Sequence, residues 1–231
     1  MLKLIKRAAG LWNRRVGVGL VRTYLYRIPR PSQPTTVKSA ANVKWELLSP
    51  KGLDVLSEIG RFDAKVGLQR LQRGDLCYVA SCDGRLAHYS WVQRSGSHPI
   101  TEAGLIVPVQ SGEFWIYNCS TVEWARGKWI YAEALKRIVV DHFRAGYGTA
   151  WIYTSQRNIP SQKGILRAGF GRVATLPTLR VGSHYLGVGT RHFDVGRPNR
   201  GNQSPAAVEF MPAIPAALHR PTVSQTTPME T

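Results

Sequence analysis

The sequence predicts one α+β domain, with a mostly antiparallel sheet of six to seven strands, a central βαβ unit and flanking helices. Three observations lead to this fold class. Segments rich in β-branched and aromatic residues are interleaved with segments of helical periodicity. The clearest helix, 129–145, lies between the strand-like segments 113–122 and 150–154, which is the order of a βαβ unit. A chain of 231 residues can bury one sizeable core but is short for two.

Turn and capping residues delimit the elements of the first half. Ser49-Pro50 places an N-cap and an N1 proline after a first strand. Gly60 and Gly74 end two short helices, and Asp83-Gly84 is a hairpin signal between two strands. The expected elements up to the central unit are a strand at 43–48, helices at 51–59 and 62–72, and strands at 76–81, 86–92 and 113–122.

The second half is predicted by the same signals. In the long helix, Ile130, Ala134 and Ile138 lie on one face, and Gly146 ends the helix. Gly169 follows a shorter helix. The expected elements are a helix at 129–145, a strand at 150–154, a helix at 159–168 and two strands between 172 and 193. A loop is expected at 95–99, and the composition of the segment 93–110 is not diagnostic.

The two ends differ from this central domain, 43–193. Apolar and basic residues alternate at helical spacing over 1–25, which predicts a basic amphipathic helix, and prolines in the rest of 1–42 mark a linker. Such a helix could be a membrane-surface anchor or a helix packed on the domain with a solvated basic face. A third alternative is a mitochondrial presequence, which the arginines and the absence of acidic residues fit but the absence of serine does not. Residues 194–231 are rich in Pro, Gly, Ser, Thr and Gln, which predicts a disordered tail.

The charge and cysteine patterns limit the function classes. The net charge is +17, and residues 1–45 hold ten of the 31 lysines and arginines without any acid, so the arm attracts anions. An anionic membrane surface is favoured over nucleic acid as its partner, because no nucleic-acid motif is present. No segment has the ~20 apolar residues of a membrane span. The three cysteines show no C-x-x-C spacing, which indicates a reducing, cytoplasmic location, with the protein peripheral to the membrane at most. The histidines show no ligand pattern, so no metal site is expected.

Three local motifs occur in order on the βαβ unit and the helix after it. Arg126-Gly127-Lys128-Trp129-Ile130-Tyr131 lies at the turn into the long helix, Asn158 and Ser161 follow the next strand, and Gly169-Phe170 ends the next helix. In motif, order and spacing, residues 43–193 resemble the GNAT superfamily of N-acetyltransferases. The resemblance implies acetyl-CoA as the co-substrate, and its pyrophosphate would bind at the unpaired N–H groups of the helix start.

The resemblance also implies where the two reactants lie. It assigns coenzyme A binding to the turn and to the residues beside the thioester: Tyr117, Cys119, Arg126, Gly127, Lys128, Trp129, Ile130, Tyr131, Asn158 and Ser161. Backbone N–H groups near Tyr117 and Cys119 would polarise the acyl carbonyl. Trp129 and Tyr131 depart from the pattern, because the family usually has small residues there. The size of these two rings raises the question of whether coenzyme A can enter.

Glu113 is the predicted general base, because some family members carry a catalytic glutamate at a similar distance before the phosphate turn, although Glu113 also suits a hairpin end. Glu123 is the second candidate, and His88 is expected to be a packing residue. Many family members have a tyrosine as general acid at the position of Ile165, which cannot donate a proton. Tyr117, Tyr131 or a water could replace it.

Three function hypotheses remain at this stage. The first is an acetyl-CoA-dependent N-acetyltransferase acting on a small-molecule amine, an amino sugar or a peptide amine. The second is a GNAT-like binding module without catalytic activity, as the two large rings and the missing tyrosine suggest. The third is an interaction protein whose basic arm docks on anionic membrane or nucleic acid. GNAT-like domains often pair, so the resemblance is also compatible with a homodimer.

Overall fold

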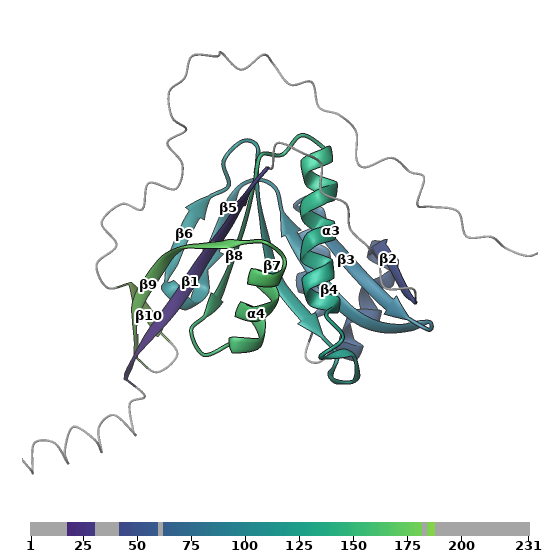
Figure 1. Ribbon diagram of the computed structural model, residues 1–231, viewed down its shortest axis with the longest axis horizontal. Coiled ribbons are helices and arrows are strands. Elements are labelled where there is room, and N and C mark those ends of the chain that lie inside the picture. Colours follow the sequence, from purple (N-terminus) through teal and green to yellow (C-terminus); the bar gives the residue numbers. More distant parts are fainter. Residues whose placement is uncertain (1–17, 31–41, 60–61, 182–183, 188–231) are drawn as a thin grey trace, which may run out of the picture. The chain divides into compact units, whose positions relative to one another are not determined.

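The computed structural model describes residues 18–30, 42–59, 62–181 and 184–187. Residues 1–17 of the predicted amphipathic helix, most of the predicted linker and the predicted tail beyond 187 lie outside the described residues. The fold of the described part is α+β, as the sequence predicts, with one sheet and helices packed against it (Figure 1).

The sheet has eight strands in the described part of the chain, in the order β10-β9-β1-β8-β7-β4-β3-β2. Neighbouring strands are antiparallel except β7 and β8, which are parallel and joined through a helix. The hairpin β5–β6 forms a separate small sheet. The strands are β1 (Gly19–Pro29), β2 (Val43–Leu47), β3 (Leu76–Cys82), β4 (Arg85–Gln93), β5 (Ser97–Ile100), β6 (Leu105–Pro108), β7 (Glu113–Thr121), β8 (Thr149–Ser155), β9 (Gly171–Val181) and β10 (His184–Gly187).

The helices agree with the sequence in place and nearly in length. The expected helix at 51–59 is a 3₁₀ helix, η1, and two further 3₁₀ turns, η2 and η3, precede β6 and the long helix. The central unit is β7-α3-β8, as predicted. The helices are η1 (Pro50–Ile59), α2 (Ala64–Gln72), η2 (Thr101–Ala103), η3 (Glu123–Ala125), α3 (Ile130–Arg144) and α4 (Ile159–Arg167).

The prediction of a helix through residue 25 is wrong for its last part, because Gly19–Pro29 is strand β1. β1 lies inside the sheet, between β8 and β9, and pairs with both of them. Five of its eleven residues are β-branched or aromatic, and Thr23, Leu25 and Tyr26 are buried. The folded domain therefore begins before residue 43, and β1 brings the sheet to eight strands instead of the predicted six or seven.

The two faces of the sheet bury different cores. On one face, α3 and α4 pack Leu135, Ile138 and Ile165 against the inward-facing residues of β7 and β8 (Figure 1). On the other face, Leu53 and Leu56 of η1 pack against alternate residues of β3 and β4. Because successive side chains of a strand point to opposite faces, this packing buries residues on both faces of β3 and β4.

The loop expected at 95–99 runs into strand β5, which forms a hairpin with β6 and has η2 at its turn. Ile100 and Ala103 of this segment are buried against Trp115, Trp151 and other residues of the sheet. The hairpin thus covers the half of the sheet that η1 and α2 leave uncovered. This arrangement places the start of the hairpin and η2 on the same face as α2.

β7 and β8 separate along their length. Their parallel ladder covers only three residue pairs, from Glu113↔Thr149 to Trp115↔Trp151. Both strands continue beyond the last pair, and Figure 1 shows them together at one end and apart at the other. From Ile116 onward, the β7 edge that faces β8 lacks a partner strand in the described part of the chain. An unpaired edge inside a sheet can accept another molecule.

A pH-dependent contribution to stability is expected from His142. His142 is a buried residue of α3, and its ring stacks on Phe114 with the ring centroids 4.4 Å apart. Burial lowers the pKa of His142 to about 4, and its Nδ1 donates to the Ile138 carbonyl. The unfolded chain therefore gains a proton near pH 6.5 that the folded chain gains only near pH 4. His142→Phe should remove a stability loss of about 1.4 kcal/mol per pH unit between these values.

Urea unfolding of the wild-type and His142→Phe proteins at pH 7.5, 6.0 and 5.0 measures this difference. The difference in the free energy of unfolding between the variant and the wild type should shift by about 2 kcal/mol in favour of the variant between pH 7.5 and pH 5.0. Equal pH slopes in the two proteins would show that His142 does not stay neutral in the fold.

Candidate functional site

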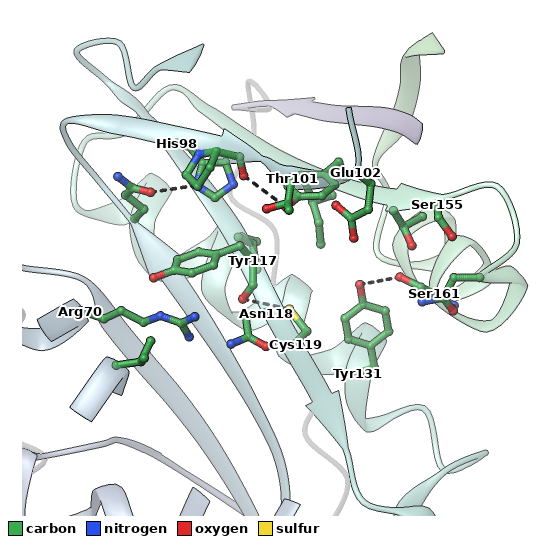
Figure 2. Close-up of a pocket in the computed structure, with 18 of the residues that line it drawn as sticks. Arg70, His98, Thr101, Glu102, Tyr117, Asn118, Cys119, Tyr131, Ser155 and Ser161 are labelled. Carbon is green, nitrogen blue, oxygen red and sulfur yellow. Dashed lines mark hydrogen bonds between the residues drawn. The ribbon is translucent and has the colours of Figure 1, made fainter. Parts of the chain in front are cut away.

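A cavity of about 580 Å³ opens between the separated ends of β7 and β8. Its floor is formed by 116–119 of β7 and 152–155 of β8. α2 contributes one wall, and the start of the β5–β6 hairpin with η2 contributes another. Tyr131 of α3 and Ser161 of α4 reach it from the opposite face of the sheet (Figure 2). The cavity therefore passes from one face of the sheet to the other through the gap between the strands.

The start of α3 presents unpaired backbone N–H groups. Trp129, in the N-cap position, makes no side-chain capping hydrogen bond, and the first helical bond runs from the Glu133 N–H to the Trp129 carbonyl. Gly127 and Trp129 both have positive φ, 78° and 62°. The alternation of positive and negative φ turns successive amides of such a loop toward one side. This is an anion-binding arrangement at the positive end of a helix.

The side chains around this turn are cationic. Arg126 and Lys128 are exposed, and the Arg126 Nε donates to the Thr121 carbonyl at 3.4 Å. The Lys128 ammonium lies over the Trp124 ring at 5.1 Å. Space beside Gly127 is open, since a Cβ there would meet nothing within 4 Å. A phosphate could approach the backbone at this position.

The two large residues of the turn point in opposite directions. Trp129 is 53% exposed and its ring stacks under the Arg167 guanidinium at 3.9 Å, so it leaves the turn open. Tyr131 points inward between α3 and α4 and lines the cavity, with its hydroxyl 3.2 Å from Ser161 Oγ (Figure 2). Burial raises the pKa of Tyr131 well above its ordinary value, so the hydroxyl keeps its proton. Tyr131 narrows the gap but does not fill it.

The start of α4 is capped by its own side chain. The Asn158 Oδ1 accepts from the Ser161 N–H at 3.2 Å, an ordinary N-cap bond, with Pro160 in the first turn. Both Asn158 and Ser161 line the cavity. Within the described part of the chain, the Asn158 amide NH₂ makes no hydrogen bond to another residue, and Asn158 is exposed, so this group can still donate to a molecule in the gap.

A bulge in β7 forms the floor beside Tyr117 and Cys119. The register between β4 and β7 shifts between Tyr89 and Trp91, and Asn118 has a φ of 44°. Tyr117 and Cys119, whose backbone N–H groups are predicted to polarise a carbonyl, lie on either side of it and line the cavity. Burial raises the pKa of the Cys119 thiol to about 12, so this sulfur is not a nucleophile at neutral pH.

The predicted base, Glu113, lies at the paired end of β7 opposite Thr149 and is not one of the cavity-lining residues. It is half-buried, and burial raises the pKa of its carboxyl, with smaller lowering effects from Trp151 and Arg27. Glu123 is exposed in η3 and also lies outside the cavity lining.

Two further residues that the sequence singled out lie in the core. His88 is fully buried, with both ring nitrogens within 2.8 Å of hydroxyls of Thr121 and Ser90. Burial lowers the pKa of His88 to about 3, which agrees with a neutral packing residue. Ile165, at the position where many GNAT members have a tyrosine, is fully buried between α3 and the sheet and offers no proton.

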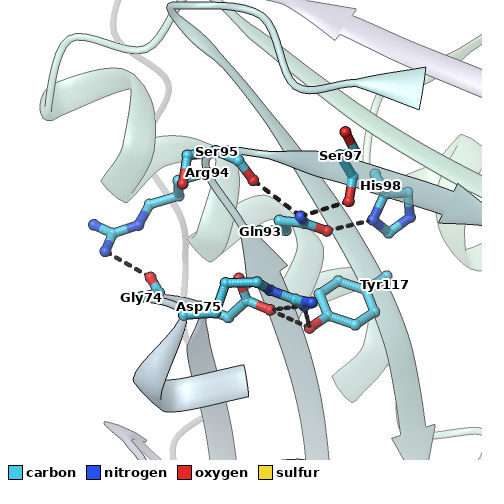
Figure 3. Close-up of polar contacts among 9 residues, drawn as sticks. Gly74, Asp75, Gln93, Arg94, Ser95, Ser97, His98 and Tyr117 are labelled. Carbon is cyan, nitrogen blue, oxygen red and sulfur yellow. Dashed lines mark hydrogen bonds and ion pairs between the residues drawn. The ribbon is translucent and has the colours of Figure 1, made fainter. Parts of the chain in front are cut away.

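The sequence did not identify His98, which starts the hairpin and lines the cavity. The Gln93 amide NH₂ donates to the Ser95 and Ser97 carbonyls, at 2.9 and 3.0 Å, so the Gln93 oxygen faces His98 Nδ1 at 2.8 Å (Figure 3). Nδ1 must therefore carry the proton. The remaining nitrogen, Nε2, keeps a lone pair and has no partner.

The environment of His98 keeps this ring neutral. His98 is 1% exposed and stacks on Trp115 at 4.8 Å, with Tyr117 edge-on at 5.2 Å. Burial, together with the charge of Arg73, lowers the pKa of His98 to about 4. No motif in the sequence marks this residue; only the fold of the hairpin brings it to Gln93 and the cavity.

Charged side chains from α2 and η2 also line the cavity without having been predicted. Arg70 and Arg73 come from α2 and the residue after it, and Glu102 from η2. Asp75 binds the Arg73 guanidinium and accepts from the Tyr117 hydroxyl (Figure 3). The cavity wall is thus polar and carries charges of both signs. In the part of the chain that the structure describes, no group of three or more metal-binding side chains occurs.

Solved structures resemble this chain in fold. A GCN5-related N-acetyltransferase from Sphaerobacter thermophilus matches with a TM-score of 0.52 at 13% identity, covering 74% of this chain and 54% of that one. An acetyltransferase of the GNAT family from Colwellia psychrerythraea matches with a TM-score of 0.51 at 13% identity, covering 70% and 56%. The chain has the GNAT fold.

This likeness lies in three dimensions. No family model matches the sequence, and no curated protein matches it. The chain spans little more than half the length of the two acetyltransferases above. Within the described residues, no helix is long and apolar enough to cross a membrane.

The start of α3 and the gap beside it have groups that could hold a phosphorylated ligand such as coenzyme A. The start of α3 offers uncapped N–H groups and two exposed cations for a pyrophosphate. The gap between β7 and β8 offers an unpaired strand edge for a pantetheine arm. Trp129 turns away from the turn, and Tyr131 lies against α4, so both large residues are accommodated.

Gly164 is expected to determine the position of Tyr131. A Cβ on Gly164 would lie 2.4 Å from the Tyr131 ring, much closer than atoms can approach. Gly164→Ala should therefore push Tyr131 toward the gap and destabilise the fold by about 1–3 kcal/mol. In Tyr131→Ala the same substitution should cost less than 0.5 kcal/mol.

A double-mutant cycle by urea unfolding measures this coupling. Additive effects of Gly164→Ala and Tyr131→Ala would contradict the packing of this ring on α4. Gly19→Ala, in β1, is a control for the general cost of adding a methyl group, because a Cβ there would meet nothing within 4 Å.

Proposed function

We propose that this protein is an acetyl-CoA-dependent N-acyltransferase that moves the acyl group directly to an amine. The observation that carries the proposal is the cavity between β7 and β8, which reaches Tyr131 in the first turn of α3 on one side and a polar pocket under α2 and η2 on the other. The uncapped turn at 126–130 lies just before Tyr131 in the chain and is not itself part of the cavity lining. The GNAT fold supports the proposal, because the same gap is where the resemblance implies that the thioester lies. Bringing two reactants together in such a gap can lower a barrier by ~7–11 kcal/mol.

In this proposal, each wall of the gap holds one part of the co-substrate. Backbone amides from Gly127 to Tyr131 bind the pyrophosphate, with Arg126 and Lys128 adding charge. Asn158 and Ser161 bind the arm from the α4 side. Backbone N–H groups beside Tyr117 and Cys119 polarise the acyl carbonyl at the β7 bulge.

Acetyl-CoA supplies an activated acyl group. The amine nitrogen bonds to the acyl carbon and the carbon–sulfur bond breaks. The amine loses one proton, and the leaving thiolate gains one to become the thiol. The protein must accept the first proton. His98 Nε2 is a candidate because its lone pair is unpartnered and its residue lines the cavity. Glu113 is the candidate that the sequence predicts.

The alternative is a GNAT-like module that binds without turnover. Two observations favour it: Tyr131 narrows the gap, and Ile165 provides no acid. Against this alternative, the Tyr131 hydroxyl keeps its proton and Tyr131 lines the cavity, so this group could protonate the leaving thiolate in place of the missing acid. Docking of the basic N-terminal segment on anionic membrane stays a proposal from the sequence, because residues 1–17 lie outside the described part.

Coenzyme A binding is expected to raise the melting temperature. Acetyl-CoA at a hundred times its Kd should add about 2.7 kcal/mol, or roughly 5–10 °C for a domain of this size. Replacing both Arg126 and Lys128 with Gln should remove most of this shift. Replacing Lys136 and Arg144, two exposed cations of α3 outside the turn, is the matched control and should leave it intact.

A wild-type protein whose melting temperature does not respond to acetyl-CoA would contradict the proposed function. If the increase in melting temperature is lost equally in both double variants, the binding depends on the overall positive charge of the protein and not on the turn before α3.

The proton acceptor can be tested by comparing two single variants. His98→Gln keeps a donor toward Gln93 but has no basic nitrogen, and it should lower kcat by ~10²-fold or more. Glu113→Gln should change kcat less than threefold, because Glu113 is not a cavity-lining residue. Steady-state rates of thiol release with a working amine, at matched melting temperature, measure both. The opposite order of effects would assign the role to Glu113.

A further inference from the structure

Arg70 is a cation of the cavity wall without an anionic partner. Its guanidinium lies over the rings of Trp91 and Tyr117, at 5.1 Å from each. The Asn118 amide, with its oxygen facing Arg70, accepts from both terminal nitrogens at 2.6 and 3.2 Å. No described carboxylate lies within 4.0 Å of this group. Arg70 is therefore held in place by neutral contacts, and its charge is uncompensated.

The neighbouring arginine shows the contrast. Arg73 binds Asp75, which is buried and also accepts from the Tyr117 hydroxyl. Asp75 therefore offsets the charge of Arg73 at the cavity wall. Arg70 lies over two neighbouring aromatic rings and is partly shielded from water, where an unpaired charge is costly and an incoming anion is bound more strongly.

The donors of Arg70 are not exhausted by its contacts. A guanidinium has five N–H groups in a planar fork, and Asn118 uses two of them. The rings use none. The remaining donors suit a carboxylate, which can accept two parallel bonds from such a fork. If Arg70 served only to support the β7 bulge, the contact with Asn118 would be enough, and a neutral side chain could make that contact as well.

Across the cavity lie two groups that suit an ammonium or an amine. Glu102 is the only carboxylate among the described cavity-lining residues, and one of its oxygens is buried without a partner. His98 adds an unprotonated Nε2. Figure 2 shows Arg70 on one side of the cavity and His98 and Glu102 on another. The cavity is thus positive on the α2 side and acceptor-rich on the hairpin side.

We propose that the acceptor is a small amine that also carries a carboxylate, such as a free amino acid, with its carboxylate bound by Arg70 and its amine directed toward His98 and Glu102. This inference rests on the proposed function and deepens it by naming the substrate class. Arg70 then determines specificity: it binds the part of the acceptor that does not react.

Matched acceptor pairs that differ only in the carboxylate test the inference. Suitable pairs are phenylalanine with phenethylamine, leucine with isoamylamine, and tryptophan with tryptamine. With acetyl-CoA and the full chain, kcat/KM should favour the amino acid at least tenfold in at least one pair. Arg70→Met, which keeps the stem and removes the charge, should reduce that preference by ~10-fold or more.

The ratio within a pair separates binding from structural damage. Loss of the bulge support would lower kcat/KM for both members, whereas loss of the ion pair lowers it for the amino acid alone. Arg70→Lys keeps the charge without the fork and should restore part of the preference. Lys65→Met removes a charge from an exposed position of α2 outside the cavity lining and should leave the preference unchanged.

Saturation-transfer NMR of each amino acid with the protein gives a readout that needs no turnover. Binding that weakens in Arg70→Met supports the inference. Equal use of both members of every pair, or a preference that survives Arg70→Met, overturns it. If acetyl-CoA raises the melting temperature but no amino acid binds or reacts, the inference fails while the cofactor half of the proposed function stands. If acetyl-CoA gives no shift, the proposed function fails as well.

Discussion

The separation of β7 from β8 after three paired positions is the feature on which the site depends. Two parallel strands normally continue their ladder, because unpaired backbone groups inside a protein are costly. Here the bulge at Asn118 turns β7 away, and stacked Trp115 and Trp151 mark the last pair before the strands part. The unpaired edge and the cavity beside it both follow from this divergence.

The rest of the fold builds walls around that gap. On one face, α3 and α4 place the uncapped turn at Arg126–Tyr131 and the Tyr131–Ser161 pair beside it. On the other face, α2 and the β5–β6 hairpin supply Arg70, His98 and Glu102. The first set suits a phosphorylated carrier, and the second suits a polar acceptor. The gap is where molecules bound by the two sets would meet.

Elements with strong local signals were predictable, and so was the family of folds. The βαβ unit, the Asp-Gly hairpin and the turn at Arg126 are encoded within short windows of sequence. The sequence does not predict β1, because the pattern of a basic amphipathic helix over 1–25 overlaps the first part of this strand. The hairpin at 97–108 was missed because it is short and its stability comes from Ile100 and Ala103 packing on the distant residues Trp115 and Trp151.

The site could be predicted only in part for the same reason. Residues of the turn belong to one contiguous motif, whereas Arg70, His98 and Glu102 come from three separate elements and carry no common spacing. The neutral state of His98 depends on Gln93, whose orientation is fixed by two loop carbonyls. Such contacts exist only in the folded chain. The roles expected of Glu113, Asn158 and the other predicted site residues stay predictions.

Amide chemical shifts give the most direct test of the central claim, that coenzyme A binds from the α3 turn into the gap between β7 and β8. In ¹⁵N-labelled protein titrated with coenzyme A, the largest shifts are expected at 127–131 and at 116–119, and inorganic pyrophosphate should move only the first group. Shifts spread over the basic surface, with these two groups unmoved, would show that the ligand is held by general charge and would contradict the account.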